Sequence, residues 1–255
     1  MSGEGLGGFG ASDLVAGGIV LMFVLVHVFG GRLRFLNRTP RSIWLSIGGG
    51  VSVAYVFLHL LPELQRSQQR LENLLGVGGF LNHHIYLLAL GGLTVFYGLE
   101  RLACSSRSAE HAPDEQRPTA RGVFWLHIGS FAIYNLAIGM LLARREEGEL
   151  SGLLLYGAAL GLHFLVNDYG LRQHHRARYH RWGRWLLAAA VVLGWLGGLL
   201  LPLPPLLVEV TIAVLAGGVI MNVMKEELPG ERESRFAAFL AGVAVYGVLL
   251  LGSSS

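Results

Sequence analysis

The sequence is poor in cysteine and in charged residues. Its 255 residues include one cysteine, Cys104, which excludes an intramolecular disulfide and a zinc site built from several cysteines of one chain. Only 15% of the residues are charged, whereas 53% are hydrophobic, which excludes an ordinary soluble domain. The HExxH, Gly-x-Ser-x-Gly and P-loop patterns do not occur, so common hydrolase and nucleotide-binding signatures are absent. The sequence does not indicate an enzyme.

Long apolar runs dominate the sequence instead. A bilayer core about 30 Å thick needs roughly 20 apolar residues per helix. Such runs predict an all-α integral membrane protein in which residues 1–255 form a single transmembrane domain. The predicted spans are approximately 13–30, 43–64, 81–100, 122–143, 151–171, 183–201, 206–225 and 236–251.

The basic residues predict the orientation of these eight spans. Sixteen of the 20 Lys and Arg residues fall in loops on one side, and four fall on the other. Cytoplasmic loops retain Lys and Arg, so both termini are expected outside, and the formal net charge of +3 indicates topology rather than a nucleic-acid partner. No Lys or Arg precedes the first run, so we expect it to be retained rather than cleaved as a signal peptide.

The longest connection is polar. Residues 101–121 are rich in Ser, Arg and Pro, a composition typical of a flexible linker. The orientation places this segment in the cytoplasm.

Two pairs of spans resemble each other. "GGVSVAYVFLHLLPE" from Gly49 aligns with "AGGVIMNVMKEELPGE" from Ala216, which puts His59 opposite Glu226, and "GGLTVFYG" aligns with "AGVAVYG". The aligned spans are an odd number apart, so the repeat is inverted in the membrane. Inverted repeats are a recurring plan of secondary transporters, whose substrate sites lie near the midplane.

Polar residues in the two central spans mark a candidate metal site. Asn135 lies in the fourth span, and the fifth contains His163, Asn167 and Asp168. Asn135 and His163 lie within about one turn of each other in depth, and His163 and Asn167 share a helix face. One imidazole, two amide oxygens and a carboxylate suit a divalent transition metal ion.

Other interpretations of these residues stay open. The same side chains can form a polar network between helices, and Asp168 can form an ion pair with Arg172, four residues later. His27 and His127 are interpreted as satisfied interhelical donors. A weaker hypothesis makes His163 and Asp168 the acid and base of a membrane enzyme.

The stretch "FLHLLPEL" marks a second polar position. It lies at the end of the second span, where His59 and Glu63 are four residues apart and therefore share a helix face. Such a pair can collect cations, or it can be an interfacial polar pair. We expect the helix to end here, at the outer membrane surface.

The chain resembles the ZIP (Zrt/Irt-like) family of divalent metal transporters. The resemblance rests on eight spans, outer termini, a long loop after the third span, the inverted repeat and "HLLPE". The family's HNxxDG motif corresponds to Tyr134–Gly139, which keeps Asn135 and places Tyr134 at the histidine. Its HExPHE motif corresponds to His163–Asp168 and keeps His163, but Phe164 replaces the bridging carboxylate and Asn167 the second ligand.

The resemblance implies a 3+2+3 arrangement in the prokaryotic inner membrane, with helices 1–3 and 6–8 forming the inverted repeat. It implies transport of divalent metal ions, zinc above all, by alternating access, with no bound cofactor. The ion would bind at Asn135, His163, Asn167 and Asp168, while Tyr134, His59, Glu63 and Glu226 would be auxiliary or entrance positions. The alternative is a ZIP-like fold with a decayed site that serves as a sensor, partner subunit or structural protein. The oligomeric state, monomer or homodimer, stays open.

Overall fold

The protein is a bundle of helices in the computed structural model, which describes residues 11–32, 43–76, 83–109, 120–144, 150–227 and 235–253. Every regular element in these ranges is helical. In chain order they are α1 (Ala11–Phe29), η1 (Gly30–Arg32), α2 (Ile43–Tyr55), η3 (Val56–Leu60), α3 (Leu61–Leu75), α4 (His84–Ala109), α5 (Ala120–Ala143), α6 (Leu150–Arg178), η5 (Tyr179–Gly183), α7 (Arg184–Leu200), α8 (Pro205–Glu227) and α9 (Phe236–Ser253).

The predicted class, a multi-pass helical membrane protein, is confirmed. Six stretches of the described chain are long and apolar enough to cross a membrane, and they include α1, α4, α5 and α8. A shorter apolar helix, Phe236–Gly252, corresponds to the eighth predicted span. The fifth predicted span falls within α6, which is helical from Leu150 to Arg178.

The sequence predicted that the second span ends at "FLHLLPEL", but the helix does not end there. The helix continues for 33 residues, from Ile43 to Leu75, through the π-helical η3, where the N–H of Leu61 donates to the carbonyl of Val56. Pro62 follows directly and has no N–H to donate, so wider π-helical winding here accommodates the missing bond. The helix ends at Gly76, whose φ of 63° is the left-handed cap conformation that glycine favours.

Both ends of the segment predicted to be a linker, residues 101–121, are helical. Helix α4 extends to Ala109 and α5 begins at Ala120, so the first part of segment 101–121 is helical, and residues 110–119 lie outside the described ranges. Helix α6 likewise extends beyond its predicted end at residue 171 and leads through the π-helical η5 into α7.

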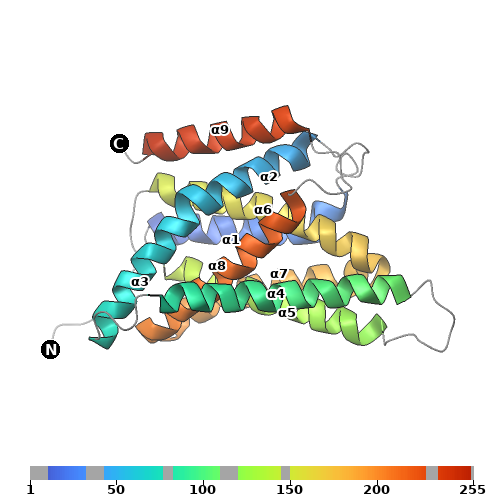
Figure 1. The fold of residues 1–255 in the computed structure, drawn as a ribbon, viewed down its shortest axis with the longest axis horizontal. Helices are drawn as coiled ribbons and strands as arrows, with labels where there is room; N and C mark the ends of the chain where they lie inside the picture. Colours follow the sequence, from blue (N-terminus) through green and yellow to red (C-terminus); the bar gives the residue numbers. More distant parts are fainter. Residues whose placement is uncertain are drawn as a thin grey trace.

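Three closely packed helix pairs organise the bundle: α2 with α9, α4 with α8, and α5 with α7. Figure 1 shows the first pair side by side along one edge. Each pair meets at glycines, because a Cβ at Gly50, Gly217 or Gly194 would overlap main-chain atoms of the neighbouring helix. Small residues at such positions let helix backbones approach closely within a membrane.

Candidate functional site

The predicted site residues are buried inside the bundle. Tyr134 and Asn135 lie on α5 and are 1% and 0% exposed, while His163, Asn167 and Asp168 lie on α6 and are at most 6% exposed. Burial of uncharged and charged polar groups in a membrane protein is costly unless they find partners. Their contacts therefore decide what the site can do.

Helix α1 supplies the central partner, His27. Its Nδ1 lies 2.9 Å from Oδ2 of Asp168, and its Nε2 lies 2.8 Å from Oδ1 of Asn135. The amide nitrogen of Asn135 donates to the carbonyl of Phe131 at 2.7 Å, which orients the amide oxygen toward His27. Both ring nitrogens thus face oxygen atoms, and the two contacts hold the imidazole between α5 and α6.

His163 belongs to a separate pair. Its Nε2 lies 3.1 Å from the hydroxyl of Tyr134. The ring of Phe164 contacts both imidazoles, with centroids 4.9 Å from His27 and 6.2 Å from His163. Within the described chain no hydrogen bond joins Asn135, His163 and Asn167 to one another: Asn135 bonds to His27 and Phe131, and His163 bonds to Tyr134.

The side chains of Asp168 and Arg172 do not form the predicted ion pair in the described structure. The Asp168 carboxylate contacts His27, and Nε of Arg172 donates to the main-chain carbonyl of Asp168 at 3.2 Å. The interpretation of His27 as a satisfied interhelical donor is correct. His127 also reaches another helix, with Nε2 3.7 Å from Glu100, which pairs with Lys225 at 2.8 Å.

Three buried polar atoms near the centre keep hydrogen-bonding capacity. They are Nδ2 of Asn167, Oδ1 of Asp168 and Nη2 of Arg172. The Asp168 carboxylate also interacts with the buried hydroxyl of Tyr179. Among the described residues, no group of three or more His, Cys, Asp and Glu side chains is placed to hold a metal ion.

A cavity of about 420 Å³ opens at the end of the bundle formed by α3, the end of α5 and the beginnings of α6 and α8. Two of its lining residues, Ile138 and Leu160, lie four and three positions along their helices from Tyr134 and His163. The cavity floor therefore lies about one turn from the Tyr134–His163 pair. The predicted entrance residues His59 and Glu63 line this cavity, whereas the side chain of Glu226 lies outside the described ones.

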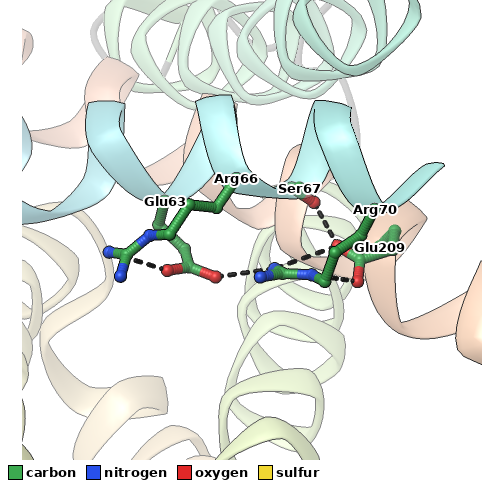
Figure 2. A network of polar contacts seen from close by, with 5 residues as sticks. All are labelled: Glu63, Arg66, Ser67, Arg70 and Glu209. Carbon is green, nitrogen blue, oxygen red and sulfur yellow. Dashed lines mark hydrogen bonds and ion pairs between the residues drawn. The ribbon is translucent and has the colours of Figure 1, made fainter. Parts of the chain in front are cut away.

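The wall of the cavity contains a polar network that joins α3 to α8 (Figure 2). Arg70 donates to Glu209 at 2.6 Å and to Glu63 at 2.7 Å, and Glu63 also pairs with Arg66 at 3.0 Å. The Ser67 hydroxyl donates to the second oxygen of Glu209. Glu209 was not among the site residues predicted from the sequence, although a lone carboxylate within a long apolar run is a functional candidate by default.

We expect Arg70→Met to weaken this end of the bundle by about 1–2 kcal/mol. This loss of stability lies between the losses expected for an exposed and a buried ion pair. Arg70 is 44% exposed, but Glu209 is only 6% exposed and would be left without its cation. Titration with SDS, followed by circular dichroism, measures the unfolding free energy. The matched control is Arg66→Met, whose partner Glu63 keeps Arg70, with an expected loss below about 0.5 kcal/mol. Equal losses in the two variants would show that Glu209 does not depend on Arg70.

Comparisons with protein-family models and with curated proteins gave no match.

Proposed function

We propose that this protein is a ZIP-like secondary transporter that carries a divalent transition metal ion, with zinc as the first candidate, by alternating access. The single observation that carries the proposal is that the cavity ends about one turn from His163. Asn167, one further turn along α6, presents an amide without a complete set of partners. A cation that entered past His59 and Glu63 would meet an imidazole first and amide and carboxylate oxygens next.

The pairing of helices supports the transporter plan. In the proposed repeat, the α2–η3–α3 helix corresponds to α8, and α4 corresponds to α9. If each helix is replaced by its counterpart in the other half, the α2–α9 pair becomes the α8–α4 pair. Both pairs are present in the structure, and both pack at glycines. This agreement is what an inverted repeat in a secondary transporter produces.

The donor set suits an ion that is bound briefly. His163 and Asn167 are neutral ligands, and Asp168 contributes one carboxylate, whose Oδ2 contacts His27 and which also interacts with the hydroxyl of Tyr179. Asn135 is engaged by His27 and Phe131, so we assign it to positioning of His27. Because few of these ligands are charged, the site would hold the metal ion weakly, which favours release of the ion after transport.

Uptake of Zn²⁺ into proteoliposomes tests the proposal. We expect His163→Ala to reduce uptake at least tenfold, since the first donor is lost. Asp168→Asn should reduce it by a similar factor, because Asp168 faces His27 rather than Arg172. Uptake should fall as the pH is lowered, because a protonated imidazole has no lone pair for the metal. His83→Ala, which removes an exposed histidine outside the cavity, should leave uptake unchanged.

A specific observation favours a second candidate, a ZIP-like bundle without metal transport that acts as a sensor, partner subunit or structural protein. The described residues contain no group of three metal-binding side chains, and Phe164 packs against both imidazoles. Absence of Zn²⁺ flux in the folded wild-type protein at every pH would exclude the transporter and leave this candidate.

A further inference from the structure

One part of the cavity between α3, α5, α6 and α8, its floor, is lined by buried aliphatic side chains. They come from four helical segments: Leu60, Ile138, Leu160, Leu215, Ala216 and Val219. These side chains provide no charge and no side-chain hydrogen bond. Three aromatic side chains, Tyr55, His59 and Tyr156, also line the cavity. A volume of about 420 Å³ is within the range of small-molecule sites, which are mostly apolar with a few polar groups that orient the ligand.

Three exposed arginines, Arg66, Arg70 and Arg144, lie at the mouth of the same cavity. Two glutamates, Glu63 and the buried Glu209, also line the cavity, so positive charge is in excess. Glu63 pairs with both Arg66 and Arg70, and Glu209 pairs with Arg70, as Figure 2 shows.

Arg144 is the remaining cation at the mouth. Its Nη2 donates a hydrogen bond to the main-chain carbonyl of Leu201, and in the described part of the chain no carboxylate pairs with it. A guanidinium has five N–H donors in a planar fork that matches a carboxylate. The end of α5 therefore offers an anion-binding group directly beside an apolar chamber.

From these observations we infer that the cavity binds a single-chain amphiphilic carboxylate, with its alkyl chain against the apolar floor and its head group at Arg144. Charge complementarity selects the anion, and the apolar walls select a chain over a small inorganic ion. The ligand would occupy the cavity proposed as the ion entrance, but it is an organic anion and its site does not include His163 or Asp168, so its binding can be measured without metal transport.

The test is equilibrium binding of radiolabelled decanoate to the full-length protein in nanodiscs of zwitterionic lipid, with empty nanodiscs subtracted. We expect saturable binding of one decanoate per chain, at least tenfold tighter than binding of decanol or decyltrimethylammonium, and no measurable binding of acetate. Arg144→Gln should weaken decanoate binding about tenfold, the effect of one charge-assisted hydrogen bond. Ile212→Trp, which places a larger side chain in the lining, should abolish it.

The matched control is Arg101→Gln, an exposed arginine on α4 that does not line the cavity, and it should bind decanoate like the wild type. Equal affinities for the three ten-carbon compounds would mean partition into lipid and overturn the inference. Unchanged binding in Arg144→Gln would also overturn it, and because Arg144 is exposed, this variant is informative even if Ile212→Trp does not fold. Acetate binding as tight as decanoate binding would exclude a role for the apolar floor.

Discussion

Gly194→Val is expected to prevent stable assembly of the bundle, whereas Gly197→Val, three residues later on α7, is expected to be tolerated. A Cβ at Gly194 would overlap the main-chain carbonyl of Leu136 on α5, while a Cβ at Gly197 has no atom within 4 Å. Backbone atoms cannot move aside as a flexible side chain can, so α5 and α7 must separate. We expect a loss of at least about 3 kcal/mol, at the upper end of overpacking effects.

The measurement is the yield of monodisperse protein in mild detergent, followed by SDS titration of any folded fraction. Gly92 and Gly91 on α4 provide an independent matched pair, because a Cβ at Gly92 would overlap Val214 of α8 and one at Gly91 would meet nothing within 4 Å. Similar stability of Gly194→Val and Gly197→Val would contradict the close α5–α7 packing described above.

His27→Ala and Asp168→Ala are expected to destabilise the protein by about 3–5 kcal/mol each. Both side chains are at most 1% exposed and lie 2.9 Å apart, so removal of either one leaves the other buried without its partner. The double variant His27→Phe with Asp168→Leu should lose less than either single variant, because well-packed apolar groups often replace a buried ion pair at little cost.

SDS titration of the two single variants and of the combined His27→Phe/Asp168→Leu variant checks this ordering. The control is His83→Ala, since His83 is exposed and its side chain lies outside the central polar group; its stability should match that of the wild type. A combined variant that loses as much as the sum of the two single losses would show that His27 and Asp168 stabilise the bundle separately, not as a pair.

The composition of the central site could be predicted from the sequence, but its pairing could not. A polar residue within an apolar run is expected to face the bundle interior, and Tyr134, Asn135, His163, Asn167 and Asp168 are all buried as expected. Their partners depend on which helices pack together. His27 is 108 residues from Asn135 and 141 residues from Asp168, and no local pattern relates positions so far apart.

Local rules also failed at two helix boundaries. Pro62 suggested the end of the second span, because proline disrupts a regular helix, but the π-helical η3 accommodates it and the helix continues to Leu75. The polar composition of residues 101–109 suggested a linker, yet α4 extends to Ala109. The composition of a segment indicates only its average preference for helix or loop. A helix that has already formed gains one hydrogen bond with each added residue, so it can extend into a polar segment.

The sequence by itself determined that this is a multi-pass helical membrane protein, because the apolar run that a bilayer requires is a local property of consecutive residues. The tertiary structure alone decided that His27 lies between Asn135 and Asp168, that Phe164 contacts both imidazoles, and that Glu209 joins α3 to α8 beside a cavity. Such contacts arise only when whole helices pack, since steric fit and the cost of unpaired polar groups act between segments that are distant in the chain.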